Sequence, residues 1–312
     1  MNKLEELLKE QAVLIVDGAL GTRLQTKGLN INDSLWSAKL LDENPNAIKA
    51  VHKEYLDSGA DLIITSSYQA SIEGFEKKGF SRQKAKELIC LSIELARKAR
   101  DEFWEEKKNK KKRIKPLVAA SIGPYGAFLA NGAEYTGKYN ISKEQLKNFH
   151  KRRVEIIAST NPDIFAIETI PSFEEAKILA EILKEYKNIP SWICFSAKDN
   201  LHINDGTKIK ECAKYLDTKE QISAIGINCT SPKYISSLIK EIKSVSNKPI
   251  VVYPNGGFKY NPLTKNWEDA KTDEKEFAKM AHLWKTQGAK LIGGCCQTEP
   301  KEIEELRRVL LS

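Results

Sequence analysis

Short apolar runs alternate along the chain with longer segments in which apolar residues recur at helical spacing. Eight of the short runs are rich in Ile, Val or Leu and lack strict polar alternation, as expected of parallel strands covered on both faces. These runs are Val13–Val16, Leu62–Thr65, Leu117–Ser121, Ile164–Ile167, Trp192–Phe195, Ala224–Asn228, Ile250–Tyr253 and Lys290–Ile292. The pattern therefore predicts eight buried parallel strands.

A segment of helical periodicity follows each predicted strand. The segments are Pro45–Ser58, Ser81–Lys107, Ser142–Thr160, Ser172–Lys187, Asp205–Leu216, Pro232–Val245, Thr272–Gln287 and Pro300–Leu311. Two of them begin with the residues of a capping box, Ser142 with Gln145 and Ser172 with Glu175. Eight strand–helix units in 312 residues predict an α/β protein with a (β/α)8 TIM-barrel fold. No repeat or Pro-rich linker divides the chain, so we expect one domain over residues 1–312; a doubly wound open sheet is the alternative.

Three stretches between the predicted elements are longer than ordinary loops. They are Gly21–Asn44, Ile122–Ile141 and Asn255–Lys271. Each follows a predicted strand, so each is expected at the end of the barrel where the strands have their carboxyl ends. Active sites of such barrels lie at this end, so the three stretches are candidate functional segments.

The composition restricts the classes of function. The hydrophobic fraction of 41% suits a large core, and no apolar run approaches the roughly 20 residues that span a bilayer. The segment Met1–Gln11 is a charged amphipathic helix pattern without the apolar centre of a signal peptide. We therefore expect a cytoplasmic location and no membrane partner.

The net charge of +8 comes from 50 basic and 42 acidic residues, and the densest basic run is Lys107–Lys115. No aromatic residue interrupts this run, so we interpret it as a solvated loop and expect no nucleic-acid partner. No long heptad segment is present, which favours a monomer or a weak homodimer.

Six cysteines in a chain of this class are expected to be thiols or metal ligands rather than disulfides. Cys90, Cys194 and Cys212 lie inside apolar periodic segments, where we expect them to be small buried hydrophobic residues. The other three directly follow predicted strands, one in the motif GINCT at 226–230 and an adjacent pair in GGCCQT at 293–298.

These three residues, Cys229, Cys295 and Cys296, form the predicted metal site. Three thiolates that converge from two strand ends suit Zn²⁺ and leave its fourth position open for chemistry. Side chains alternate along a strand, so the adjacent cysteines reach one ion only if Gly293 and Gly294 allow a bend. The sequence thus predicts one zinc ion per chain, in an enzyme whose substrate binds through sulfur. Unrelated buried thiols and a redox disulfide are the alternatives.

Two acids, Asp17 and Glu168, each directly follow an apolar run, where a carboxylate without a partner is costly to bury. Together they could hold the ammonium group of a ligand, while the N–H of Gly18 and the hydroxyl of Thr65 take its carboxylate. A general acid–base pair would leave the same pattern. None of the four histidines lies at a predicted strand end, which weakens hypotheses that need a histidine base or zinc ligand.

These motifs resemble those of the homocysteine S-methyltransferase family over almost the whole chain. The matching motifs are DGALGT at 17–22, LWSA at 35–38, SSYQA at 66–70, SIGP at 121–124, ET at 168–169, GINC at 226–229 and GGCC at 293–296. The motifs LWSA, SYQA and VYPN at 252–255 look closest to the branch that uses S-methylmethionine. Members that use betaine carry a tyrosine where Thr169 follows Glu168 here, so that tyrosine contact is not expected in this chain.

The resemblance implies a zinc ion on Cys229, Cys295 and Cys296, with the homocysteine thiol as fourth ligand. A free thiol has a pKa of about 8.5, and coordination deprotonates it. The thiolate then takes a methyl group from a sulfonium donor in an in-line displacement, which gives methionine.

The resemblance further implies that Asp17 and Glu168 face the homocysteine ammonium, with Gly18 and Thr65 on the rest of its amino-acid group. S-Methylmethionine is the expected donor and S-adenosylmethionine the second choice. A betaine-type donor and a different zinc enzyme on the same barrel are the alternatives. A structural zinc in a binding protein would need four closed ligands, and the sequence offers three.

Aromatic rings in the long stretches are candidate contacts for a cationic donor. They are Tyr125, Phe128, Tyr135, Tyr139 and Trp267. Packing of the loops onto the barrel is the simpler interpretation for most of them.

Overall fold

The structure, a computed structural model, describes residues 2–111, 113–257, 260–261, 266–267 and 271–311. Eight parallel strands form one sheet in the order β1, β10, β7, β6, β5, β4, β3, β2, and a bridge between Val16 and Leu62 joins its two edges. The strands are β1 Leu14–Ile15, β2 Leu62–Ile64, β3 Leu117–Ile122, β4 Ile164–Ile170, β5 Ser191–Phe195, β6 Ile222–Asn228, β7 Ile250–Tyr253 and β10 Ala289–Ile292. Each predicted strand overlaps one of these, so the (β/α)8 barrel is confirmed.

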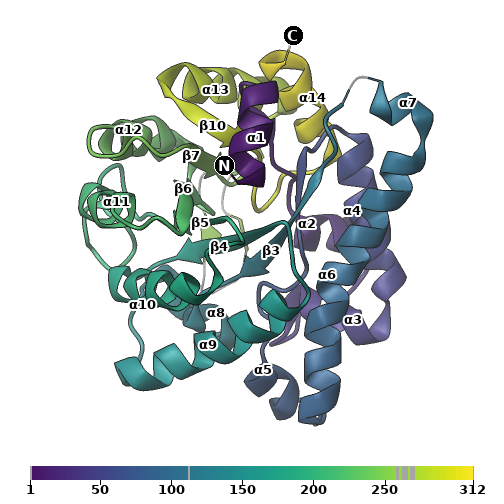
Figure 1. Ribbon diagram of the computed structural model, residues 1–312, viewed down its shortest axis with the longest axis vertical. Coiled ribbons are helices and arrows are strands. Elements are labelled where there is room, and N and C mark those ends of the chain that lie inside the picture. Colours follow the sequence, from purple (N-terminus) through teal and green to yellow (C-terminus); the bar gives the residue numbers. More distant parts are fainter. Residues whose placement is uncertain (1, 112, 258–259, 262–265, 268–270, 312) are drawn as a thin grey trace.

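A layer of helices surrounds the strands (Figure 1). The main helices are α4 Pro45–Asp57, α6 Arg82–Glu105, α9 Lys143–Ser159, α10 Phe173–Leu183, α11 Ile209–Asp217, α12 Pro232–Lys243, α13 Glu274–Gln287 and α14 Pro300–Leu310. The capping box of Ser142 and Gln145 is confirmed at the start of α9. The box at α10 is only half formed, because the Glu175 carboxylate instead accepts hydrogen bonds from the Tyr125 N–H and the Tyr139 hydroxyl.

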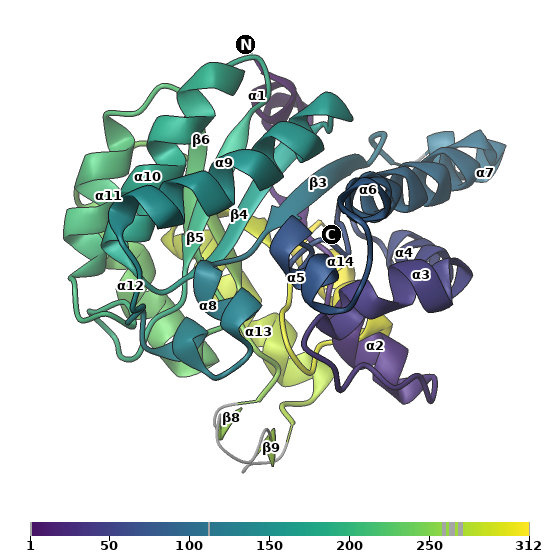
Figure 2. The same ribbon diagram turned by 90° about the horizontal axis from the view of Figure 1, so that it is seen from below.

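The barrel interior is packed with alternate side chains of the strands, and the N-terminal helix closes one end of it. Leu14 of β1, Val16 directly after β1, and Ala166 of β4 belong to this interior cluster. Leu4 of α1 (Lys3–Glu10) is fully buried in the same cluster. Figure 2 shows α1 at one end of the barrel and α2 (Leu20–Thr26) and α8 (Tyr125–Leu129) at the other. Only the second end, where the strands have their carboxyl ends, carries the long connections.

The three long stretches contain short elements that hydrophobic periodicity did not predict. The first contains α2, the 3-10 helix η1 (Trp36–Lys39) and α3 (Leu40–Glu43), and the second contains α8 and η2 (Ala133–Tyr135). In the third, β8 (Tyr260–Asn261) pairs with β9 (Asn266–Trp267), while residues 258–259, 262–265 and 268–270 lie outside the described residues. Helix α5 (Ile72–Lys77), after β2, was not predicted either.

Two smaller predictions need correction. The basic run at 107–115 begins with a short exposed helix, α7 (Lys107–Lys110), rather than a loop throughout. Cys194 and Cys212 are fully buried as predicted, but Cys90 on α6 is only half-buried. Among the described residues, no helix is long and apolar enough to cross a membrane.

Candidate functional site

The carboxyl ends of the strands bring polar side chains into the top layer of the barrel interior. Glu168 continues the series of inward-facing side chains that Ile164 and Ala166 begin on β4. Ser121 of β3 and Tyr253 of β7 face the same interior, and both hydroxyls hydrogen-bond to the Glu168 carboxylate. Both residues were predicted to lie at strand ends, but neither was predicted to belong to the site. The alternation of side chains along a strand would have shown that both point into the barrel.

The three predicted metal ligands lie together at this end of the barrel. Their sulfur atoms all lie within 4.8 Å of one another, and the Sγ atoms of Cys229 and Cys296 are 3.9 Å apart. Two thiolates at 2.3 Å from one tetrahedral zinc ion would be about 3.8 Å apart. The three side chains therefore fit the zinc geometry, and three ligands leave one position free.

A tight turn aims Cys295 and Cys296 at the same point. The N–H of Thr298 donates to the carbonyl of Cys295 over 3.0 Å, and Gln297 has a φ of +65°. A positive φ at the third position of a hydrogen-bonded turn is the type II arrangement. We call residues 295–298 the cysteine turn.

Gly293 and Gly294 are needed for close packing rather than for an unusual backbone, which corrects the expected bend. Neither glycine has a positive φ. A Cβ on Gly293 would lie 2.5 Å from the carbonyl oxygen of Val16, and one on Gly294 would overlap the Thr298 side chain. The absence of side chains lets the cysteine turn approach the loop after β1.

Cys229 is presented by a strained strand end. Its φ is +47°, and Thr169 at the end of β4 has a φ of +58°, both unfavourable for residues with a side chain. The Asn228 side chain connects the two strands, because its Oδ1 accepts from the Thr169 N–H at 2.6 Å and its Nδ2 donates to Thr169 Oγ1 at 2.8 Å. Pattern analysis did not predict this strain, since it depends on contacts between strands.

The thiols interact strongly with one another. The Cys229 and Cys295 thiols donate hydrogen bonds to Cys296 and hold the pKa of that thiol well below its ordinary value. Hydrogen bonds that its own thiol donates to the two neighbouring sulfur atoms, together with burial, raise the pKa of Cys229. The cluster thus stabilises a thiolate, and a divalent cation would take the place of the shared protons.

Asp17 and Glu168 are buried without a basic partner. Asp17 is 2% exposed, and its Oδ2 accepts a hydrogen bond from the Ile64 N–H at 2.8 Å. Burial, opposed by that bond and assisted by the Glu168 charge, raises the pKa of Asp17 well above its usual range. Burial likewise raises the pKa of Glu168 to about 7. Neither acid forms an ion pair with a lysine or arginine of the described part of the chain, as expected of a site for a cationic ligand group.

The other two predicted substrate residues lie beside Asp17. Gly18 follows Asp17, and a Cβ there would be 2.8 Å from the Tyr55 ring. Within the described residues, the N–H of Gly18 has no hydrogen-bond partner, so it can donate to a ligand. The Thr65 hydroxyl lies 2.7 Å from Ser67 Oγ and accepts from the Ser121 N–H at 3.0 Å. Its role toward a ligand stays a prediction.

Three aromatic candidates of the second stretch, Tyr125, Phe128 and Tyr139, pack in a cluster of rings with Phe149 of α9. The rings of Tyr125, Phe128 and Phe149 lie 5.0 to 5.3 Å apart, and Tyr139 lies 5.5 Å from Tyr125. Tyr68 was not among the predicted donor contacts. Its hydroxyl hydrogen-bonds to Thr169, and the charge of Cys229 helps to raise the pKa of this hydroxyl. The Trp267 side chain lies outside the described residues.

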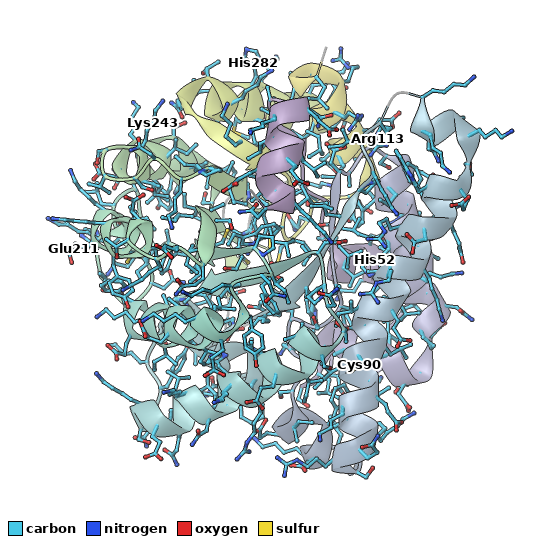
Figure 3. The ribbon with its side chains drawn as sticks, viewed as in Figure 1. His52, Cys90, Arg113, Glu211, Lys243 and His282 are labelled. Atoms are coloured by element: carbon cyan, nitrogen blue, oxygen red, sulfur yellow. The ribbon has the colours of Figure 1, made fainter. Side chains whose placement is uncertain are left out.

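The histidines lie away from the thiol cluster. His52 on α4 and His282 on α13 belong to the helical layer (Figure 3). His150 on α9 hydrogen-bonds to Glu175, and His202, beyond β5, to Asp199. The position of all four agrees with a site built from thiols and carboxylates.

Comparison with protein families gives a match over nearly the whole chain. A profile of the homocysteine S-methyltransferase family matches residues 14–310. Homocysteine S-methyltransferase YbgG of Bacillus subtilis (strain 168) is 49% identical over 306 residues, which are 98% of this chain and 97% of that protein. Homocysteine S-methyltransferase 1 of Arabidopsis thaliana is 45% identical over 98% of this chain and 96% of its own length.

A solved structure supports the same relationship. The metallated form of the homocysteine methyltransferase MmuM from Escherichia coli superimposes with a TM-score of 0.88 at 39% sequence identity. The match covers 98% of this chain and 99% of that one.

Proposed function

The chain belongs to the homocysteine S-methyltransferase family, and on that premise we propose that it is a zinc enzyme with a sulfonium methyl donor. It is an S-methyltransferase with homocysteine as the methyl acceptor. The observation that carries the zinc assignment is the cluster of Cys229, Cys295 and Cys296, whose sulfur atoms lie within 4.8 Å of one another.

The three cysteines would hold the ion and leave one position for the acceptor sulfur. Bound zinc would lower the pKa of the homocysteine thiol, so that it is a thiolate at neutral pH. The acceptor sulfur then forms a bond to the methyl carbon as the bond from that carbon to the donor sulfur breaks. The electron pair stays on the donor sulfur, which becomes a neutral thioether, so this step needs no general acid.

The protein would orient the acceptor through its amino-acid group. Asp17 and Glu168 supply negative charge for the ammonium, which explains why the two acids are buried with no basic partner among the described residues. The N–H of Gly18, which has no hydrogen-bond partner in the described part of the chain, is suited to the carboxylate, and the Thr65 hydroxyl is assigned to the same group. Held at both ends, the acceptor presents its sulfur in one direction, which accounts for much of the catalytic effect of such a site.

We propose S-methylmethionine as the donor, which would give two molecules of methionine per turnover. The proposal is supported by the motifs LWSA, SYQA and VYPN, and by Thr169 in the position after Glu168. S-Adenosylmethionine is the second sulfonium donor to be tried. The cytoplasmic location, the absence of nucleic-acid and membrane partners and the monomeric or weakly dimeric state remain predictions.

The test is metal content combined with methionine formation from homocysteine. The assay would compare S-methylmethionine, S-adenosylmethionine and betaine as donors. We expect about one zinc per chain, turnover with S-methylmethionine, loss of turnover on chelation and recovery with added zinc. Turnover with betaine alone would refute the donor, and turnover that survives complete removal of zinc would refute the metal.

A further inference from the structure

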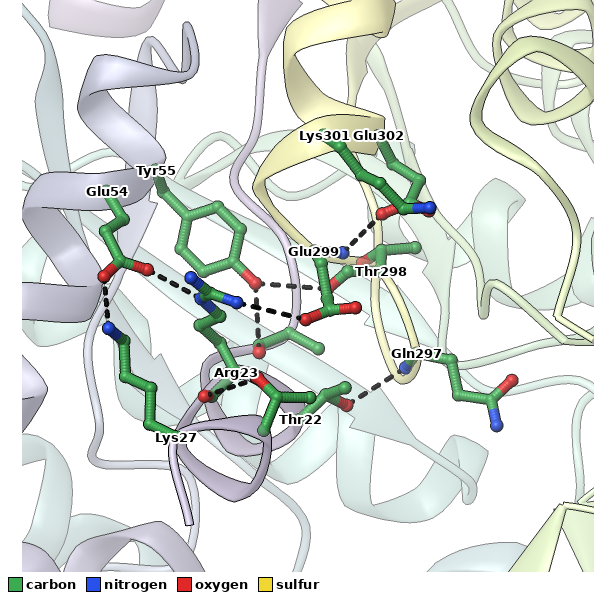
Figure 4. Close-up of polar contacts among 12 residues, drawn as sticks. Thr22, Arg23, Lys27, Glu54, Tyr55, Gln297, Thr298, Glu299, Lys301 and Glu302 are labelled. Carbon is green, nitrogen blue, oxygen red and sulfur yellow. Dashed lines mark hydrogen bonds and ion pairs between the residues drawn. The ribbon is translucent and has the colours of Figure 1, made fainter. Parts of the chain in front are cut away.

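Tyr55 of α4 connects two segments of the site that are far apart in the sequence. Its side chain is fully buried, and its hydroxyl lies 3.1 Å from the carbonyl oxygens of both Ala19 and Thr298 (Figure 4). Ala19 follows Asp17 and Gly18, and we call residues 17–19 the substrate loop. Thr298 is the last residue of the cysteine turn. One hydroxyl therefore bridges the substrate loop and the turn that carries two metal ligands.

The contact is directional and close. Burial and the nearby Asp17 carboxylate raise the pKa of Tyr55, so the hydroxyl remains protonated and shares its proton between two carbonyls. The ring also packs against the substrate loop, because a Cβ on Gly18 would lie 2.8 Å from it. The two segments touch directly as well, through the Ala19 N–H, which donates to the Thr298 carbonyl at 3.0 Å.

A second hydrogen bond and two ion pairs involve residues that lie in these two segments or shortly after them. The Gln297 N–H donates to Thr22 Oγ1 at 3.1 Å, which links the cysteine turn to α2 (Figure 4). Arg23 of α2 pairs with Glu54 of α4 at 2.6 Å and with Glu299 at 3.4 Å. The helix that carries Tyr55 is therefore also tied to α2, which follows the substrate loop, and α2 is tied to Glu299, which follows the cysteine turn.

We infer that Tyr55 is a positioning residue that couples the metal-holding cysteine turn to the substrate loop. The cysteine turn carries the metal ligands Cys295 and Cys296, and the substrate loop carries Asp17 and Gly18. A shift of one segment relative to the other would therefore move the metal ligands away from the residues that bind homocysteine. Loss of the hydroxyl should therefore weaken zinc retention and homocysteine binding together. The inference rests on the proposed function, since it assigns zinc and homocysteine to these segments.

The variant that tests it is Tyr55→Phe, which keeps the buried ring and removes only the hydroxyl. Zinc affinity, measured by competition with a chromophoric chelator, should fall about fivefold, the size expected of one net hydrogen bond. The KM for homocysteine should rise by a similar factor, while kcat at saturating zinc and homocysteine should change less than twofold.

Ser191→Ala is the matched control. The buried Ser191 hydroxyl also donates to a backbone carbonyl, that of Gln221 at 2.6 Å, but it lies at the start of β5, at the opposite end of the barrel. This variant should lose similar stability without a change in zinc affinity or KM. Equal zinc affinity and equal KM in Tyr55→Phe and Ser191→Ala would overturn the inference.

Two further measurements cover the remaining outcomes. If Tyr55→Phe does not fold, Thr22→Val removes the second connection, and unchanged zinc affinity in that variant would overturn the inference. If the wild-type chain holds no zinc, the proposed function fails, and amide hydrogen exchange of residues 294–299 then tests the coupling alone. Exchange should be faster in Tyr55→Phe than in the wild type and in Ser191→Ala; equal exchange would overturn the inference.

Discussion

The two ends of the barrel both bury carboxylates, but in opposite surroundings. At the N-terminal end, Asp61 is fully buried and pairs with Arg307 at 2.8 Å and Arg113 at 3.5 Å. It also accepts hydrogen bonds from the Gln11 side chain at 2.6 Å and the Ile15 N–H at 3.0 Å. Its charge is thus compensated within the protein.

At the C-terminal end, Asp17 and Glu168 have only neutral donors among the described residues. A buried acid with a built-in cation serves stability, whereas a buried acid without one costs stability and invites a cation from outside. Buried carboxylates at the two ends therefore differ in whether the protein itself supplies a cation, and the proposed ligand site lies at the end where it does not. The thiol cluster lies at the end with the uncompensated acids, where the acceptor sulfur would have to be.

The largest effect is expected from Cys296→Ser, which removes a soft ligand from the C-terminal end. Zinc binding should be lost, and turnover should fall about a thousandfold or more, equivalent to about 4 kcal/mol of transition-state stabilisation. The fold should persist, since the barrel core does not depend on the ion. Zinc analysis, methionine assays and circular dichroism would check this, with Cys90→Ser on α6 as a control that keeps activity. Collapse of the fold would instead indicate a structural zinc.

The next largest effect comes from replacing an acid by its amide at each end of the barrel, in Asp61→Asn and Asp17→Asn. Asp61→Asn should lower the free energy of unfolding by about 4 kcal/mol, because it leaves two arginines facing an uncharged group. Asp17→Asn should leave stability within about 1 kcal/mol of the wild type, since no built-in cation loses its partner. It should instead raise the KM for homocysteine about tenfold or more. Urea denaturation and steady-state kinetics would measure both, and equal destabilisation by the two changes would contradict the comparison.

A smaller effect concerns the pH dependence of stability in the zinc-free protein. The pKa of Glu168 rises on folding from 4.5 to about 7, so between these values the folded state holds a proton that the unfolded state has lost. The contribution of this proton to the free energy of unfolding is fully present below the unfolded pKa. It is lost as the pH rises toward 7, and the total loss is about 3 kcal/mol. Glu168→Gln should abolish this loss. Denaturation curves from about pH 5 to pH 8 would show it as a difference between the two proteins; parallel curves would argue against an uncompensated acid.

The sequence predicted the barrel because its strands are continuous apolar runs that nothing else explains. It predicted Cys229, Cys295, Cys296, Asp17 and Glu168 as site candidates because each stands at the end of such a run. Short helices such as η1, α5 and α8 escaped, since one or two turns do not establish a period of 3.6 residues.

Other features depend on contacts that pattern does not carry. Cys229 has a positive φ beside Asn228, whose side chain hydrogen-bonds to the end of β4, two strands away in the sheet. Gly294 packs closely against the Thr298 side chain. Tyr55 lies in the last turn of α4, where its helical spacing is that of an ordinary core residue. Only one of the two hydrogen bonds of the Ser172 capping box forms. The Glu175 carboxylate accepts from Tyr125 and Tyr139 instead of from the N-cap backbone.

The measurement that tests the central claim most directly is X-ray absorption at the zinc edge, with and without homocysteine. The claim is that three cysteines hold the ion and that the acceptor sulfur takes the remaining position. The account predicts three sulfur neighbours and one lighter neighbour in the zinc-loaded protein, and four sulfur neighbours after homocysteine is added. An unchanged count of three sulfur neighbours at saturating homocysteine, or a protein that takes up no zinc in its fully reduced state, would contradict it.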